Sequence, residues 1–457
     1  MSLPPELYLL AFAHLPPSSL AAISLCSRLF RIWAFPLLYN RVFLMNNEQA
    51  SAFASRVTDQ ELGEPTQRII DGLRFAEHVK CLYVGHDDMS VLNETLQLLI
   101  LAIPSLKQLQ GLVWKPWLDY WDGATFLSHA FASIRDNCDN FDSLSILIHR
   151  DGGFDEFMDF RLDFRGRLKH LQIQTDDISL WDDEIICIMA KVARFSPDLE
   201  TLDLSLHGNL SPEAVWDVDE FCKSLDGIRY SRLQCLKLCD AAYVDLASLG
   251  DISSHPSPFR SFLELNHHNI TILSLPPPTR PFDSFPDDLH LPADIFPNLR
   301  EFEGTIYWCH QISKLRYPAS QLRTMNILME RPIYEEINNY NNYGYYDEEK
   351  ALEMVYSALR SCSALTELVL CDDFPVTGDI LRTLSECAPG LQTLTCFLDL
   401  TEAVEPIIPA LPCFKRLRRF TTNKHILLMD HIMSSGREQP LLLDDISRVN
   451  VEEDHWW

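Results

Sequence analysis

The sequence contains no apolar run of the roughly 18 residues that a membrane-spanning helix needs. No basic region precedes Leu7, and Pro4, Pro5 and Glu6 interrupt the apolar start, which argues against a secretory signal. Basic residues are few, because 38 Lys and Arg stand against 65 Asp and Glu, a net charge of −27 over 457 residues. Phosphate groups are bound by cationic side chains. We therefore expect an intracellular protein, in the cytoplasm or the nucleus, that binds neither nucleic acid nor membranes.

Motifs for catalysis and metal binding are also missing. There is no Gly-rich phosphate loop, no G-x-S-x-G elbow and no H-E-x-x-H. None of the 13 cysteines forms a C-x-x-C pair, and the nearest spacings, Cys235 with Cys239 and Cys309 with His310, do not recur as a four-ligand set. We expect no catalytic residues, no metal and no cofactor, which leaves binding as the function.

The segment from Leu3 to Tyr39 is rich in apolar residues and punctuated by proline. Pro4 and Pro5 suit the first turn of a helix, and Pro16 and Pro17 stop it. A second helix is expected to start near Ser18 or Ser19, and a third to end before Pro36. Because three such short helices cannot bury a core alone, we expect this segment to dock on a partner.

These residues resemble the F-box family. The resemblance rests on Leu3-Pro4-x-Glu6-Leu7, on Leu15-Pro16 followed by Leu20, on Leu25-Cys26-Ser27-Arg28-Leu29-Phe30-Arg31, and on Pro36-Leu37-Leu38-Tyr39, an ending similar to fungal members. It covers about a tenth of the chain, and Phe30 stands where many members have Trp. The resemblance implies binding to the Skp-type adaptor of a cullin–RING ubiquitin ligase, through residues that contact the adaptor or support the contact: Leu3, Pro4, Leu7, Leu10, Leu15, Pro16, Leu20, Leu25, Cys26 and Phe30.

Beyond residue 75 a frame of the form apolar-x-x-apolar-x-apolar recurs about twelve times. Nine copies are clear, and weaker ones start at Leu106, Leu299 and Leu417. The clear copies are Val79/Leu82/Val84, Phe141/Leu144/Ile146, Leu168/Leu171/Ile173, Leu199/Leu202/Leu204, Leu233/Leu236/Leu238, Ile270/Leu273/Leu275, Leu322/Met325/Ile327, Leu365/Leu368/Leu370 and Leu391/Leu394/Cys396. Helical patterns separate the frames, and alternating strands and helices imply parallel strands joined by crossovers.

The repeats resemble the leucine-rich repeats that follow F-boxes in ubiquitin-ligase receptors. We predict an α/β protein: a right-handed leucine-rich-repeat solenoid with a curved parallel sheet, preceded by a small all-α module. The predicted boundaries are a helical module at 1–45, a helical linker or cap at 46–75, an irregular solenoid at 76–430 and an acidic tail at 431–457. Proline-rich and Tyr/Asn-rich stretches predict long loops at 251–297 and 331–347.

Residues between the frame positions alternate to the opposite face of the sheet, and they are the candidates for contact with a substrate protein. The face is mixed, polar and mildly acidic. The candidates are Tyr83, His170, Gln172, Asp203, Lys237, Glu301, Glu303, Asn326, Glu367 and Phe397.

The resemblance thus implies a receptor, without catalytic residues of its own, that links a target protein to a Skp–cullin–F-box ligase. A scaffold whose N-terminal helices only cap the solenoid is the main alternative. A small-molecule sensor with a ligand under the long loops is the third.

Overall fold

The computed structural model describes residues 4–61, 74–85, 92–115, 122–148, 164, 166–175, 183–206, 216–225, 227–240, 242–250, 256–276, 289–328, 348–371, 374, 376–396, 408–422 and 426–428. The chain divides into two compact units, Met1–Leu233 and Gln234–Trp457. The proposed tail, the loop at 331–347 and the candidate Phe397 lie outside the described residues.

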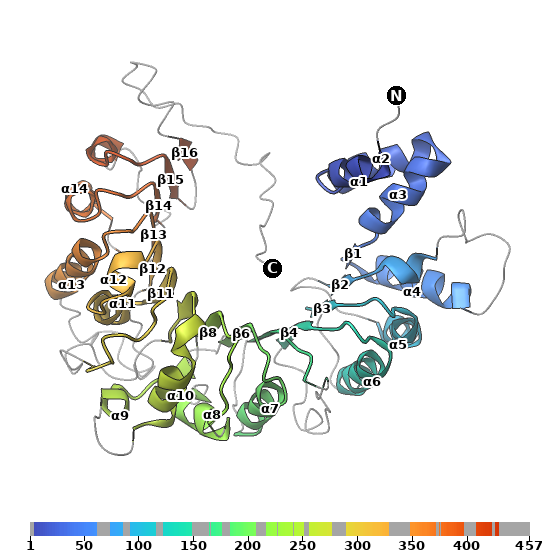
Figure 1. Ribbon diagram of the computed structural model, residues 1–457, viewed down its shortest axis with the longest axis horizontal. Coiled ribbons are helices and arrows are strands. Elements are labelled where there is room, and N and C mark those ends of the chain that lie inside the picture. The colour runs from blue at the N-terminus through green and yellow to red at the C-terminus, as the bar shows by residue number, and fades with distance from the viewer. Residues whose placement is uncertain are drawn as a thin grey trace. The chain divides into compact units, whose positions relative to one another are not determined.

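Three short helices open the first unit: α1 (Pro5–Phe12), α2 (Pro17–Cys26) and α3 (Arg28–Leu38) (Figure 1). Helix α2 begins at Pro17 itself, not at the predicted serines. Ser27 caps α3, accepting a hydrogen bond from the amide of Phe30 at 3.1 Å. The prediction that α3 ends before Pro36 is wrong, because the helix continues to Leu38. Proline there removes one hydrogen bond, and the burial of Ala34 and Phe35 offsets the loss.

Six parallel strands of the first unit pair in chain order (Figure 1). They are β1 (Arg41–Leu44), β2 (Cys81–Val84), β3 (Gly111–Trp114), β4 (Ser143–Ile148), β5 (His170–Thr175) and β6 (Thr201–Leu206). The helices of this unit are α4 (Asn47–Glu61), α5 (Asn93–Ala102), α6 (Asp122–Asn137), α7 (Asp183–Arg194) and α8 (Val218–Ser224), with 3-10 turns η1 (Phe75–His78) and η2 (Ile103–Ser105). A short strand, β7 (Trp216–Asp217), precedes α8.

The second unit repeats this arrangement. Parallel strands pair in the order β8 (Cys235–Asp240), β10 (Ile272–Ser274), β11 (Glu301–Thr305), β12 (Thr324–Leu328), β13 (Glu367–Leu370), β14 (Thr393–Cys396) and β15 (Arg419–Thr422), and β16 (Ile426–Leu428) adds antiparallel to β15. The other elements are β9 (Ala242–Tyr243), α9 (Leu246–Gly250), α10 (Pro258–Asn266), η4 (His267–Asn269), α11 (Ile306–Ser313), α12 (Pro318–Gln321), α13 (Glu348–Ser361), α14 (Gly378–Cys387) and η6 (Ile408–Cys413).

The central position of the frame forms one continuous buried row in each unit. In the first unit the row continues from Leu82 through Leu112, Leu144 and Leu171 to Leu202. In the second it runs Leu236, Leu273, Phe302, Met325, Leu368, Leu394 and Phe420. Each strand contributes one apolar side chain to the row, and burial of this row stabilises the stacked repeats. The predicted α/β leucine-rich-repeat fold, preceded by an all-α module, is confirmed.

Three local predictions differ from the structure. The weak frame at Leu106 is shifted, because Leu112 and not Leu109 pairs beside Leu82. The solenoid was predicted to begin at residue 76, but its sheet already includes strand β1, because Val42 pairs with Leu82. The predicted loop at 251–297 contains helix α10, which Ser257 caps by accepting from the amide of Arg260 at 3.2 Å.

Candidate functional site

The N-terminal helices bury a small aromatic core of their own, contrary to the prediction that three such short helices cannot. Phe12, Leu20 and Ala34 are buried at its centre. Tyr8, Phe30 and Trp33 pack around Phe12, with Phe30 meeting it edge-on at a centroid distance of 5.8 Å. Because the inward-facing positions are taken by these large rings, the leucines between them turn outward.

Five leucines of these helices are exposed: Leu7 48%, Leu9 41%, Leu10 62%, Leu25 78% and Leu29 52%. They make up half of the ten large exposed hydrophobic side chains in the described part of the chain. Scattered single apolar side chains are ordinary on a protein surface, but such a concentration on three short helices indicates a docking surface.

The predicted adaptor-contact residues separate into two groups. Pro4, Leu7, Leu10, Pro16, Leu25 and Cys26 are exposed and available for contact. Leu20 is buried in the helical core, and Leu15 and Phe30 pack against it, so these three support the helices. Leu3 lies outside the described residues. Leu9 and Leu29 are also exposed but were not among the predicted contact residues; Leu29 lies within the quoted motif, whereas only its exposure in the structure points to Leu9.

On the first unit, polar side chains that alternate with the buried row form hydrogen bonds across adjacent strands. Ser145 donates to Gln172 at 2.7 Å, and the amide nitrogen of Gln172 donates to Asp203 at 3.1 Å. His170 Nδ1 lies 3.0 Å from the hydroxyl of Thr201. The structure therefore joins the candidates Gln172 and Asp203 by a hydrogen bond and places His170 on the same strand as Gln172, with Thr201 as its own partner.

The second unit carries a similar set. Ser274 donates to Glu303 at 2.7 Å, and Asn326 donates to the other oxygen of the same carboxylate. Glu301 lies two residues before Glu303 on β11. The pKa of Glu301 is raised, first by burial and then by the negative charge of Glu367. Lys237 opposes this rise. These candidates form a polar, acidic stretch over β8 to β13.

A further candidate, Tyr83, stacks on Phe43, which was not among the predicted contact residues. The rings of Phe43 and Tyr83 lie 4.4 Å apart between centroids with their planes 15° apart. Phe43 is 54% exposed. Phe43 was not predicted as a contact residue because the residues of strand β1 were assigned to the helical module.

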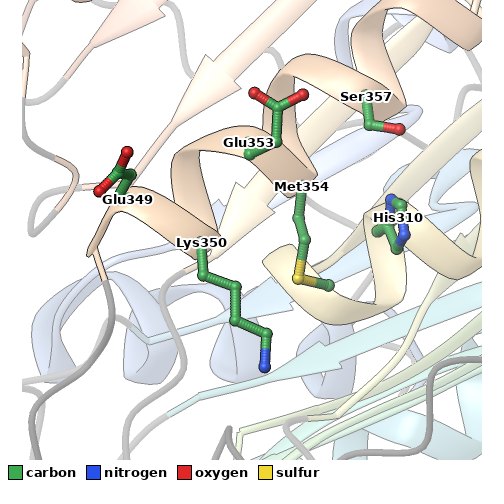
Figure 2. Close-up of a pocket in the computed structure, with 6 residues that line it drawn as sticks. All are labelled: His310, Glu349, Lys350, Glu353, Met354 and Ser357. Atoms are coloured by element: carbon green, nitrogen blue, oxygen red, sulfur yellow. The ribbon is translucent and has the colours of Figure 1, made fainter.

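A cavity of about 490 Å³ opens on the helical layer of the second unit (Figure 2). His310 of α11 faces Glu349, Lys350, Glu353, Met354 and Ser357 of α13 across it. Burial lowers the pKa of His310, as does the nearby charge of Lys314. Two carboxylates and one ammonium group line the same opening, so the lining carries both signs of charge.

The described residues contain neither a candidate membrane span nor a cluster of metal ligands. Their helices include none with the length and apolar character to cross a membrane. Nor does this part of the chain bring three or more His, Cys, Asp or Glu side chains together as metal ligands.

The family model of the F-box domain matches residues 1–34. The chain carries an F-box domain over these residues, which are the helices that expose the five leucines. No curated protein matches the sequence. Among solved structures, the chain is similar to the Rad7 and Elc1 complex in yeast, at 12% identity over 88% of this chain and 91% of that one, with a TM-score of 0.49. It is also similar to the TLR13–ssRNA13 complex, at 12% identity over 76% of this chain and 46% of that one, with a TM-score of 0.34.

Proposed function

We propose that this protein is a non-catalytic substrate receptor of a Skp–cullin–F-box ubiquitin ligase. Its F-box helices bind the Skp-type adaptor, and the polar face of the repeat strands binds a protein to be ubiquitylated. The ligase chemistry belongs to partner subunits. The receptor contributes by holding its target near the transferring enzyme, which raises the effective concentration of the target.

One observation carries the proposal: the exposed leucines lie on the segment that matches the F-box domain. Leu7 and Leu10 are one turn apart on α1, and Leu25 and Leu29 flank the junction of α2 and α3. Contact between these side chains and a partner surface would be favourable, because burial of apolar surface contributes about 25 cal/mol of free energy per Å². The neighbouring aromatic core keeps the helices folded while these side chains stay available.

Co-purification with a Skp-type adaptor and a cullin tests the proposal. The test variant is Leu10→Asp combined with Leu25→Asp, at the two most exposed leucines of the helices. The matched control is Leu92→Asp combined with Leu101→Asp, which changes two leucines of 60% and 63% exposure at α5 of the same unit. Circular dichroism checks that all variants keep the helix content of the wild type.

Wild type and control are expected to retain adaptor and cullin, and the test variant to lose both. Loss of binding in the control as well would make the effect one of general surface charge. If the wild type itself retains no adaptor, the helices only cap the repeats, and the scaffold alternative replaces the receptor.

A further inference from the structure

The first two strands of the sheet carry an exposed aromatic and cationic surface. Arg41 and Phe43 of β1 pair in register with Cys81 and Tyr83 of β2, so the four side chains share one face. Phe43 stacks on Tyr83, and Arg41 is exposed. The charge of Arg41 reaches both neighbours on β2, since it lowers the pKa of Cys81 and of Tyr83 against the larger effect of burial, which raises both.

Strand β1 is also the first strand in the sheet, and within the described residues no strand pairs with its outer side. The register and the bonds from Cys81 to the Asn40 carbonyl and from Gly85 to the Leu44 carbonyl assign the even-numbered residues to the β2 side. In a parallel ladder the backbone N–H and C=O groups of Arg41 and Phe43 therefore point to the outer edge. Val42, whose partner Leu82 is buried, stays partly exposed, as expected for a strand with a paired neighbour on one side only.

The charge of this region is opposite to that of the whole chain. Over residues 40–45, 79–85 and 109–115 the charged side chains are Arg41, Lys80 and Lys115, and none is acidic. The chain as a whole carries −27. Asp142, whose charge also reaches Cys81, is held by Lys169 at 2.8 Å. A cation beside an exposed aromatic pair favours a partner segment that has both a carboxylate and an apolar side chain.

We propose that the outer edge of β1 binds an extended, acidic segment of the substrate protein as an added strand, with an apolar side chain over Phe43 and Tyr83 and a carboxylate against Arg41. Addition of a strand to an exposed edge supplies backbone hydrogen bonds, while alternate side chains supply specificity. This inference rests on the receptor function proposed above, and it names the chemistry of the substrate.

The geometry fixes the spacing of the two side chains. Arg41 and Phe43 are two residues apart on one face, and a paired strand repeats its side chains on that face with the same period. The acidic and apolar residues of the partner are therefore separated by one residue, in either order according to the direction of the added strand. Moving one of them by a single position sends it to the opposite face.

Fluorescence anisotropy with the full-length chain tests this spacing. The probes are fluorescein-labelled Ser-Thr-Glu-Thr-Leu-Thr-Ser and its reversed order Ser-Thr-Leu-Thr-Glu-Thr-Ser. Two comparison peptides are Ser-Glu-Thr-Thr-Leu-Thr-Ser, with the spacing changed by one residue, and Ser-Thr-Lys-Thr-Leu-Thr-Ser, with the charge reversed. The protein variants are Phe43→Ser and Arg41→Glu, and the matched control is Arg419→Glu, at an exposed strand position in the second unit.

One of the two Glu-x-Leu probes is expected to bind at least about tenfold more tightly than both comparison peptides. Phe43→Ser should weaken that binding about tenfold, and Arg41→Glu should reverse the preference in favour of the lysine peptide, whereas Arg419→Glu should change neither. Equal binding of the peptide with changed spacing, an unaltered charge preference in Arg41→Glu, or no binding of any probe would overturn the inference. Adaptor co-purification from the same preparations separates the two proposals, because adaptor binding without peptide binding rejects only the β1 site.

Discussion

Tyr8 of α1 stacks on Trp33 of α3, with 5.2 Å between ring centroids and 23° between planes. The contact joins the first and third helices of the F-box domain, and the same two rings also contact Phe12 and Phe30. Stacked aromatic pairs contribute about 1 kcal/mol beyond the area they bury. The relationship matters for function because the leucines proposed to contact the adaptor are positioned only while these helices stay packed.

Removing this contact should loosen the F-box domain without changing its exposed leucines. We expect Tyr8→Ala to lower the local stability of the three helices by about 2 kcal/mol, from lost stacking and a partial cavity. Hydrogen exchange measured by mass spectrometry should show faster exchange over residues 5–38. Tyr8→Phe keeps the ring and should exchange like the wild type. Unchanged exchange in Tyr8→Ala would show that the stack contributes nothing.

Gly304 is required by close packing at the end of β11. A Cβ atom built there would lie 2.9 Å from the ring of Phe302 and 3.1 Å from the Cβ of Trp308, and both side chains are buried. Gly304→Ala should therefore destabilise the second unit by about 2 kcal/mol through overpacking, seen as a lower midpoint of urea unfolding. Gly250→Ala, whose Cβ would meet Leu289 at an ordinary 3.8 Å, is the control and should not lower the midpoint.

Arg260 is a buried cation that joins three segments of the second unit. It donates to the carbonyl of Leu249 at 2.9 Å, to the carbonyl of His290 at 3.0 Å and to Glu264 at 2.9 Å. Arg260→Met should cost about 3 kcal/mol, because it removes three charge-assisted hydrogen bonds and leaves the buried carbonyl of Leu249 without this donor. Thermal unfolding of the variant is the measurement, with Arg323→Met, at an exposed position, as the control. Equal loss in both variants would contradict the role of Arg260.

The repeat frame predicted most of the sheet from the sequence because each strand contributes one leucine-like residue to the same buried row. Strand β1 was not predicted, although Tyr39, Val42 and Leu44 fit the frame and Val42 pairs with Leu82. The preceding Pro36-Leu37-Leu38-Tyr39 resembled an F-box ending, and the same residues cannot be assigned to both elements by pattern alone. The exposed stack of Phe43 on Tyr83 was hidden for the same reason.

Other features of the candidate site depend on contacts between residues distant in sequence. Exposure divides the adaptor-contact candidates, since Leu10 faces solvent and Leu20 fills the core, yet both are simply leucines of an amphipathic helix in the sequence. The hydrogen bonds from Ser145 through Gln172 to Asp203 can be predicted only when the strand register is known, and the spacing of the repeats in the sequence gives that register only approximately. The assignment of substrate contacts to this face stays a prediction.

His267 should make the second unit sensitive to pH. It is buried, and its Nδ1 accepts a hydrogen bond from the amide of Phe296 at 3.2 Å, which requires that nitrogen to be unprotonated. Burial lowers the pKa of His267 below its usual 6.5, and the neighbouring His268 lowers it further, while Asp294 and Glu264 oppose both.

The sign of the effect follows from this direction. At a pH well above 6.5 the imidazole is neutral in both the folded and the unfolded chain, and the native hydrogen bond is intact. As the pH falls below 6.5 the unfolded chain binds a proton before the folded one does, so the free energy of unfolding decreases. The decrease continues until the pH reaches the lowered pKa of the folded state.

The measurement is the midpoint of urea unfolding at pH 7.5, 6.5 and 5.5 for wild type and His267→Asn. Asparagine can accept a hydrogen bond from the amide but does not titrate, so the variant should lose part of the decrease between pH 7.5 and 5.5. The pKa values of His78 and His310 are also lowered by burial, so both residues contribute to a remaining slope. His14→Asn, at an exposed position, should keep the full slope. An unchanged slope in His267→Asn would show that protonation at this site does not couple to folding.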